Sequence, residues 1–414
     1  MNKTKHYLKI VISGHVDHGK STLIGRLFYD TDSIPEEKIK EIKEVCRQLG
    51  REMEFSFVMD NLQEEREQSI TIDTAQTFFK TPKREYVIID APGHKEFIKN
   101  MITGASQAEA GVLIVSAKEG AEEQTKRHAY ILKMLDLKQI LVVINKMDLV
   151  DYKRQKFNKV KKQIEAFLKK LNLKPTFIIP ISAAKGDNIA KKSKKMKWHK
   201  GKTLLSSLDS FKESKKITKA PLRFLVQDIY PINQKRILVG RVESGTIKKG
   251  QKVLILPSKE TAKIKSIEVF MKKPTSASAG QSIGITLEED LFIERGAVIC
   301  TQKDQPKVTD EISANVFWMS KKDLKRGERI IIKNVTQETE GEIKTISNKI
   351  DSSTFKKISA QARILKNNEV GEVKIKIDEP IAIDDPNQIK ETGRIILERD
   401  MIACGAGLIN IEEK

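Results

Sequence analysis

Residues 14–22 read GHVDHGKST and complete the phosphate-binding pattern G-x-x-x-x-G-K-[ST]. The flanks suit such a loop, because residues 7–12 (YLKIVI) are typical of a buried strand and residues 21–28 have the apolar spacing of a packed helix. Gly14 and Gly19 would let the backbone curl until its N–H groups point at phosphate oxygens. The stretch therefore predicts a nucleotide-phosphate site, and a glycine-rich turn that binds nothing is the less favoured alternative.

The residues of this loop have distinct expected roles. Lys20 would reach the β- and γ-phosphates, and the Ser21 hydroxyl would ligate Mg²⁺. The whole loop is predicted to bind the nucleotide: Gly14, His15, Val16, Asp17, His18, Gly19, Lys20, Ser21 and Thr22.

Apolar strands and helical segments alternate downstream of this loop. Strands are expected at residues 85–89, 111–116, 140–144 and 176–181, and helices near 125–135 and 157–171. Such alternation predicts an α/β P-loop domain with a doubly wound, mostly parallel sheet, whose ligands bind beyond the carboxyl ends of the strands.

Three further loops follow the carboxyl ends of these expected strands. They are Asp90-Ala91-Pro92-Gly93-His94, Asn145-Lys146-Met147-Asp148 and Ser182-Ala183-Ala184. Asp90 would hold Mg²⁺ through water, and the Gly93 N–H could sense the γ-phosphate. Asp148 would accept from the N1–H and 2-amino groups that only guanine presents together. Four loops in order at four strand ends predict a site for GTP or GDP with Mg²⁺.

Other residues would complete this site. Asn145 and Lys146 are expected to brace the base and the phosphate loop, beside residues 182–184. Thr71 is the expected switch residue, because its hydroxyl could complete the Mg²⁺ shell only when GTP is bound. The predicted metal ligands are Ser21, Thr71 and Asp90.

The second half of the chain changes character near residue 220. Short strands and glycine turns follow one another there, as in the segments 222–229, 236–242 and 252–256, so this half is predicted to be all β. We expect a GTP-binding domain at 1–215 and two β-barrel domains at 220–305 and 308–414. Neither β region shows a catalytic cluster.

Charge is distributed unevenly along the 414 residues. The formal net charge is +20, and residues 153–219 hold 21 Lys and Arg against 4 Asp and Glu, a local net charge of +17. Such a stretch could contact nucleic acid. Lysine without arginine is weak evidence for specific recognition, so a solvated helix face with a loop is the favoured interpretation.

The composition indicates the cellular compartment in which the protein is expected. No run of 18 or more apolar residues is present, which argues against a membrane span. The segment 1–6 before the first expected strand is short and polar, which does not fit a signal peptide. Cys46, Cys300 and Cys404 are odd in number and far apart, which suits a reducing cytosol and offers no metal cluster. We therefore expect a cytoplasmic protein.

These motifs, together with residues 99–105 (KNMITGA), resemble the translational-GTPase superfamily, in particular the branch with elongation factor Tu and the GTPase subunit of sulfate adenylyltransferase. The resemblance covers essentially the whole chain and implies a GTPase domain followed by two β-barrels. It implies that His94 is catalytic and orients the hydrolytic water, with Val16 and Ile70 as an apolar gate.

Several stretches look more like the sulfate adenylyltransferase subunit than the tRNA-carrying factors, which usually have Arg at the position of Gln68. They are residues 25–31, 65–68, 125–128, 145–152, 185–189, 315–319 and 405–409. His18 and Ser69 depart from that subunit's usual pattern. The expected function is GTP hydrolysis coupled to adenylyl transfer from ATP to sulfate by a separate, smaller catalytic subunit. One alternative is delivery of aminoacyl-tRNA by a factor like elongation factor 1-alpha or Tu, and another is a GTPase of this architecture with a different partner. Membrane partners are not expected.

Overall fold

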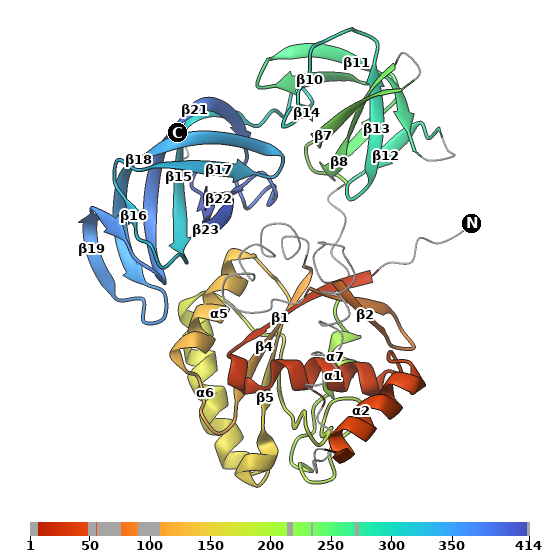
Figure 1. Cartoon of the computed structure of the whole chain (residues 1–414), viewed down its shortest axis with the longest axis vertical. Coiled ribbons are helices and arrows are strands. Elements are labelled where there is room, and N and C mark those ends of the chain that lie inside the picture. The colour runs from red at the N-terminus through yellow and green to blue at the C-terminus, as the bar shows by residue number, and fades with distance from the viewer. Residues whose placement is uncertain are drawn as a thin grey trace. The chain divides into compact units, whose positions relative to one another are not determined.

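The computed structural model describes residues 7–48, 55, 76–89, 108–212, 218–232, 235–269 and 273–411. The chain divides into two compact units, Met1–Glu213 and Ser214–Lys414. Figure 1 shows the first unit as helices around a sheet and the second as strands. The predicted site residues Thr71, Asp90, Gly93 and His94 lie outside the described residues.

A six-stranded sheet forms the centre of the first unit, with the strand order β2-β3-β1-β4-β5-β6. Pairing is parallel except between β2 and β3, which form an antiparallel hairpin. Strands β4 and β5 are buried along their whole length, because helices cover both faces of a doubly wound sheet. The strand bounds are β1 Tyr7–Gly14, β2 Gln76–Lys80, β3 Glu85–Ile89, β4 Ala110–Ser116, β5 Ile140–Asn145 and β6 Phe177–Pro180.

Helices lie on both sides of this sheet (Figure 1). Their bounds are α1 Lys20–Asp30, α2 Glu36–Gln48, α5 Glu123–Met134, α6 Arg154–Lys170 and α7 Leu204–Leu208. In α1, Leu23, Leu27 and their neighbours recur at helical spacing and enter one core cluster with Ile10 of β1. The fold class predicted from the alternation of strands and helices is confirmed.

The second unit begins with a closed barrel in the strand order β10-β11-β13-β8-β7-β14. Its bounds are β7 Arg223–Ile232, β8 Lys235–Ser244, β10 Lys252–Leu256, β11 Glu260–Glu268, β13 Ser282–Leu287 and β14 Val298–Cys300. A small sheet of β9 Thr246–Lys248 and β12 Ser276–Ser278 accompanies it. Alternation in β11 buries Ala262 and Ile264, as expected for a strand with one solvated face. An irregularity between Ile264 and Ser266 shifts the register, and Ile267 follows them into the barrel core.

A second β region follows, with the order β17-β22-β23-β15-β21-β18-β19 and a further pairing of β17 with β18 that closes the ring. Its bounds are β15 Lys307–Trp318, β17 Arg329–Asn334, β18 Gln337–Asp351, β19 Lys357–Ala362, β21 Glu369–Ile383, β22 Arg394–Arg399 and β23 Ile402–Ile409, with a short pair β16 Leu324–Lys325 and β20 Ile364–Leu365. Trp318 is fully buried in its core. We propose 220–305 and 308–414 as the limits of the two β domains, and 1–215 for the GTP-binding domain.

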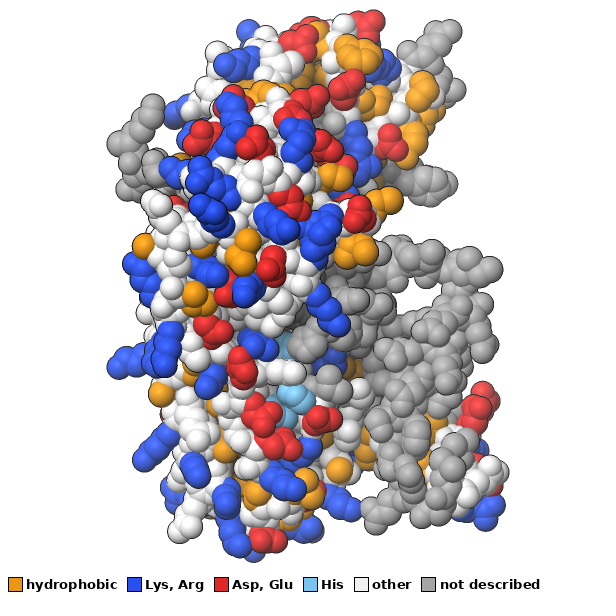
Figure 2. All heavy atoms as spheres, turned by 60° about the vertical axis from the view of Figure 1, so that its left-hand side comes forward, with side chains coloured by type: hydrophobic (Ala, Val, Ile, Leu, Met, Phe, Trp, Pro, Cys, Tyr) orange, Lys and Arg blue, Asp and Glu red, His pale blue; other side chains and the backbone are white. Residues whose placement is uncertain are grey.

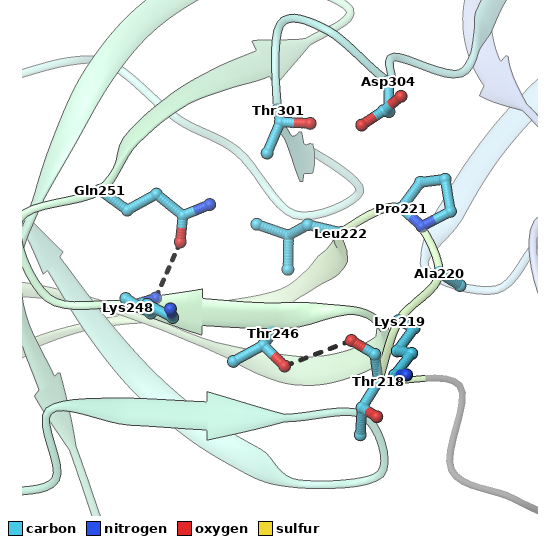
Figure 3. Close-up of a pocket in the computed structure, with 10 residues that line it drawn as sticks. All are labelled: Thr218, Lys219, Ala220, Pro221, Leu222, Thr246, Lys248, Gln251, Thr301 and Asp304. Atoms are coloured by element: carbon cyan, nitrogen blue, oxygen red, sulfur yellow. Dashed lines mark hydrogen bonds between the residues drawn. The ribbon is translucent and has the colours of Figure 1, made fainter.

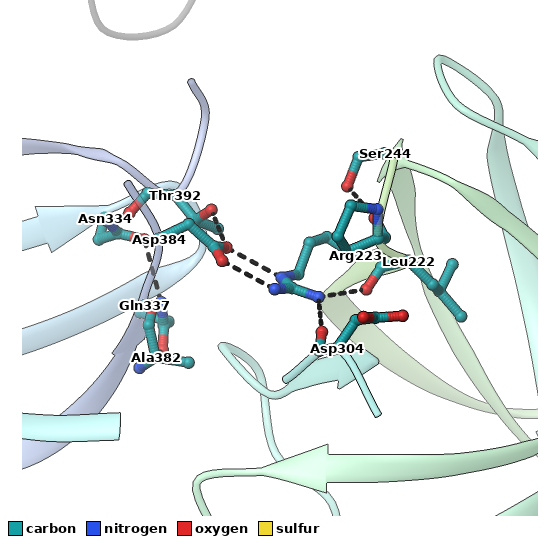
Figure 4. A network of polar contacts seen from close by, with 10 residues as sticks. Leu222, Arg223, Ser244, Asp304, Asn334, Gln337, Ala382, Asp384 and Thr392 are labelled. Atoms are coloured by element: carbon teal, nitrogen blue, oxygen red, sulfur yellow. Dashed lines mark hydrogen bonds and ion pairs between the residues drawn. The ribbon is translucent and has the colours of Figure 1, made fainter. Parts of the chain in front are cut away.

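A buried ion pair joins these two β regions (Figure 4). The Arg223 guanidinium donates to both carboxylate oxygens of Asp384, with Nε–Oδ2 and Nη2–Oδ1 distances of 2.9 and 2.7 Å. Arg223 also donates to the carbonyl oxygens of Leu222 and Asp304, and the Thr392 hydroxyl donates to Asp384. The pair is thus fully hydrogen-bonded, as a buried charge pair must be.

Two further features concern the cysteines and the helices. The three cysteines are free and buried, and burial raises the pKa of the Cys300 thiol to about 11, which keeps it protonated and unreactive. Among the described helices, none has the length and apolar character needed to cross a bilayer.

Candidate nucleotide-binding site

The predicted phosphate loop lies between β1 and α1. Residues Val16–His18 form a short 3-10 turn, and Gly19 follows in the left-handed conformation with φ of 85° as the residue before α1. The loop therefore ends at the amino end of an 11-residue helix, where free N–H groups and the helix dipole favour an anion. Lys20, Ser21 and Thr22 occupy the first turn of this helix, each half-buried.

Both glycines of the pattern sit where a side chain would collide. A Cβ on Gly14 would lie 2.7 Å from the carbonyl oxygen of Ile114 in β4. A Cβ on Gly19 would lie 2.7 Å from Nδ2 of Asn145 at the end of β5. The loop is thus pressed against two neighbouring strand ends, and this backbone cradle fits a phosphate chain.

Asn145 ties three of the predicted loops together. Its Nδ2 donates to the His18 carbonyl oxygen at 2.9 Å, and its Oδ1 accepts from the Ala183 N–H at 2.9 Å. The side chain is 2% exposed. The structure thus brings Asn145, the phosphate loop and residues 182–184 together, and we propose that this amide braces the loop around the bound nucleotide.

Asp148 is oriented by the last of these loops. The Ser182 hydroxyl donates to Asp148 Oδ1 at 2.6 Å, and the backbone N–H of Lys185 donates to the Ser182 hydroxyl at 3.2 Å. Lys146 takes a left-handed conformation with φ of 62°, which turns the chain into the 3-10 turn Met147–Val150. The half-buried Asp148 carboxylate is therefore fixed in direction, and we propose that it reads the guanine base.

His18 lies in an environment that the sequence pattern did not indicate. Its imidazole is fully buried, with Nδ1 3.4 Å from the Ile114 carbonyl oxygen. Its Nε2 is 3.4 Å from Glu119 Oε2 and 3.9 Å from Glu122 Oε2. Burial lowers the pKa of His18, and this effect outweighs the opposing carboxylates. Both carboxylates belong to the segment between β4 and α5, which carries no recognisable motif.

His15, His18 and Glu122 also form a group whose ligand atoms all lie within 4.8 Å of one another. His15 Nδ1 accepts the Asp17 N–H at 3.0 Å, and this bond caps the 3-10 turn. Because that lone pair is already used, we assign His15 a role in holding the loop rather than in binding a metal.

Arg26 is a second residue that motif analysis did not single out for the site. Its guanidinium forms an ion pair with Asp30 at 2.8 Å, and burial raises the pKa of Asp30 against the opposing effect of Arg26. A Cβ on Gly186 would lie 2.2 Å from Arg26 Nη2, so this glycine admits the guanidinium. Arg26 therefore connects α1 with the loop that follows Ser182–Ala184.

A separate pocket of about 590 Å³ opens in the second unit (Figure 3). Its lining includes one carboxylate, Asp304, and two lysines, Lys219 and Lys248. The Gln251 side-chain oxygen accepts from the Lys248 N–H at 2.8 Å, which closes one wall. Besides Asp304 the lining contains no carboxylate, and it contains no histidine or cysteine.

The phosphate loop with Gly14 and Gly19 lies at the start of α1, and the oriented Asp148 follows β5, two strands away from β1 in the sheet. This combination is typical of a P-loop GTPase, which is the class of this protein. Three family models match the chain: "Elongation factor Tu GTP binding domain" at residues 5–217, "Elongation factor Tu domain 2" at 235–300 and "GTP-eEF1A C-terminal domain-like" at 311–410. The chain belongs to the translational GTPase family.

Relatives of two kinds are similar over nearly the whole chain. Elongation factor 1-alpha of Pyrococcus furiosus is 39% identical over 99% of this chain and 98% of its own length. Sulfate adenylyltransferase subunit 1 of Aeromonas hydrophila is 34% identical over 98% of this chain and 86% of its own length. A solved structure of Sup35 complexed with GDP aligns at 22% identity and a TM-score of 0.46, covering 99% of this chain and 95% of that chain.

Family membership makes this chain a GTPase that binds GTP and GDP with Mg²⁺. Mg²⁺ supplies charge neutralisation at the β- and γ-phosphate oxygens when it is bound. Of the three predicted ligands, Ser21 is among the described residues, and we propose that its hydroxyl holds the ion. The roles of Thr71, Asp90, Gly93 and His94 stay predictions from the sequence.

Proposed function

We propose that this chain is the GTPase subunit of a sulfate adenylyltransferase. It would couple GTP hydrolysis to the formation of adenylyl sulfate and pyrophosphate from ATP and sulfate, which a separate smaller subunit carries out. Adenylyl sulfate formation is strongly uphill, and a GTP-driven switch can supply free energy if hydrolysis depends on the state of the partner.

One observation carries this proposal. Two of the stretches that resemble the sulfate adenylyltransferase subunit, 25–31 and 185–189, meet each other beside the predicted guanine site. Their contact is the approach of the Arg26 guanidinium to Gly186, and the Arg26–Asp30 ion pair lies within the first stretch. Two of the seven stretches of similarity therefore lie together beside the predicted nucleotide site. The 34% identity to subunit 1 of the Aeromonas hydrophila enzyme is further support.

The second candidate is a factor that delivers aminoacyl-tRNA. It is favoured by the higher identity to elongation factor 1-alpha of Pyrococcus furiosus, 39%, and by the 98% coverage of that protein. Both candidates place the chain in the cytoplasm, and the three buried free cysteines suit a reducing compartment.

Affinity capture separates the two candidates. The tagged chain, loaded with a non-hydrolysable GTP analogue, is recovered from its own cells, and the co-purified molecules are identified by mass spectrometry and RNA sequencing. A stoichiometric small ATP-binding subunit, with adenylyl sulfate formation that GTP stimulates, supports the proposal. Recovery of aminoacyl-tRNA, with no such subunit, would contradict it and establish the second candidate. A GDP-loaded sample is the matched control, because a switch partner should prefer the GTP form.

A further inference from the structure

The excess positive charge of the chain is gathered on two neighbouring segments of the first unit. Helix α6, Arg154–Lys170, holds 7 Lys and Arg and a single acidic residue, Glu165. Residues 191–202 hold 7 Lys and no Asp or Glu. We call these two segments together the lysine surface.

The segment 191–202 is packed onto the start of α6. Trp198 Nε1 donates to the Tyr152 carbonyl oxygen at 3.0 Å, and the Trp198 ring lies 5.3 Å from the ring of Phe157 in α6. Burial lowers the pKa of His199, and the charges of Lys192 and Lys161 lower it further, one from each segment. The two segments therefore form one continuous surface.

The positive charges of the lysine surface destabilise helix α6. The first turn of α6 contains no acidic residue, and Arg154 and Lys156 stand at its positive end. Lys156, Lys159 and Lys162 are exposed and three residues apart, so they repel one another along one face. Each such arrangement destabilises a helix, which points to a role of these lysines outside the fold.

A general excess of lysine in the chain does not explain the surface. Outside residues 153–219 the chain has 55 Lys and Arg against 52 Asp and Glu, which leaves a net charge of only +3. Lysines elsewhere are balanced by carboxylates, and the lysine surface is not. In Figure 1, α6 lies on the left of the first unit. Figure 2 brings that side forward, and many Lys and Arg side chains, coloured blue, project separately from it.

The chemistry of the surface indicates a phosphate backbone as its partner. Protein interfaces centre on apolar and aromatic side chains, whereas no large hydrophobic side chain of α6 or of 191–202 is exposed. Lysine is a point charge without the planar fork with which arginine reads one particular group. The 17 residues of α6 extend about 25 Å, which is long enough to face several successive phosphates.

We propose that the lysine surface binds the phosphate backbone of RNA without sequence preference. Contacts of this kind position a nucleic acid and carry no base information. We infer this independently of the proposed function, because the surface lies on elements that do not contribute a predicted nucleotide ligand.

Salt-dependent binding of a short single-stranded homopolymeric RNA, measured by fluorescence anisotropy on the full chain with GDP, tests the proposal. One variant carries Lys156→Gln, Lys159→Gln and Lys162→Gln, and a second carries Lys192→Gln, Lys194→Gln and Lys197→Gln. The matched control carries Lys252→Gln, Lys357→Gln and Lys366→Gln, three exposed lysines of the second unit. Unchanged GDP affinity shows that each variant is folded.

We expect each lysine-surface variant to bind RNA at least about tenfold more weakly near 0.1 M salt, and the control to bind like the wild type. The slope of log Kd against log salt should fall by about 2 for three lost contacts. Equal loss in the control variant, or an unchanged slope, would overturn the proposal. So would binding of polyglutamate or of phosphatidylserine vesicles to the same lysines without binding of RNA.

Discussion

At the scale of single residues, the site depends on Asn145 and Asp148, which lie at and just after the end of β5 and have different roles. Asn145 is almost fully buried and holds two other loops, whereas Asp148 is half-buried and is held by Ser182. The buried amide thus acts as a support, and we propose that the more accessible carboxylate is the group that faces the guanine base.

Replacement of Asp148 by Asn should shift specificity from guanine toward xanthine. The acceptor oxygen lost in this variant is the one proposed to pair with the guanine N1–H and 2-amino groups. We expect GDP to bind at least about a hundredfold more weakly and xanthosine diphosphate to bind better than GDP. Calorimetric titration with both nucleotides measures this. Ser182→Ala is the matched control, with a smaller loss and retained preference for GDP; a D148N protein that still prefers GDP would refute the assignment.

The buried His18 should make the fold sensitive to acid. Because its pKa is lowered from the ordinary value of 6.5, the unfolded chain takes up a proton near that pH while the folded chain does not. Stability is therefore unaffected by this group well above pH 6.5 and declines as the pH falls below it. Urea midpoints of the wild type should fall more steeply from about pH 7 to about pH 5 than those of His18→Gln.

His199, whose pKa burial also lowers, provides the comparison for this experiment. His199→Gln removes the other described histidine with a lowered pKa, so the variant separates the two contributions. Parallel pH profiles for the wild type and His18→Gln would contradict the role given to His18.

His94 should be required for hydrolysis and dispensable for binding. By family resemblance it orients the attacking water, so His94→Ala should slow single-turnover GTP hydrolysis at least about a hundredfold while GTP affinity changes little. Rapid-quench kinetics and nucleotide titration measure the two quantities separately. A loss of affinity comparable with the loss of rate would show that the residue has another role.

At the scale of elements, the ion pair between Arg223 of β7 and Asp384 at the end of β21 links the two β regions. Both side chains are buried, with 3% and 7% exposed. Removing the Asp384 carboxylate leaves the buried Arg223 charge unpaired, so Asp384→Ala should lower the free energy of unfolding by about 3–5 kcal/mol.

Replacing both residues of the pair, as Arg223→Met with Asp384→Leu, should restore much of that lost stability. Denaturant unfolding of the two variants checks this, and a loss under about 1 kcal/mol for Asp384→Ala would contradict it.

The elements of the first unit were predictable because their signals are local. Strands β4 and β5 are uninterrupted apolar runs, and α6 has buried residues at helical spacing. Strand β23 was not predicted, because its sequence IACGAGLI is rich in small residues and has weak strand preference. Its pairing with β15 and β22 defines it, and this pairing is a tertiary effect.

The site was predictable in part for the same reason. Asn145 and Asp148 belong to a motif at a strand end, and the structure places both beside the phosphate loop or its partner loop. Glu119 and Glu122 belong to no motif, and Arg26 lies in a stretch, 25–31, to which the sequence analysis gave no role in the site. All three reach the site because the fold brings their segments there. Likewise, no sequence pattern indicated that Trp198 holds the lysine-rich loop against α6.

At the scale of the whole molecule, the chain combines a GTPase domain with a second unit that is built of strands. Family membership establishes the GTPase. In the function that we propose, the state of a partner subunit decides when hydrolysis occurs.

The most direct test is steady-state GTP hydrolysis by the purified chain with its co-purified partner, in the presence and absence of ATP and sulfate. We predict that ATP and sulfate together raise GTP turnover at least about tenfold and that adenylyl sulfate accumulates in proportion to the GTP consumed. The chain alone and the His94→Ala complex are the controls. A turnover that ATP and sulfate leave unchanged, but that ribosomes with aminoacyl-tRNA raise, would contradict the proposed function.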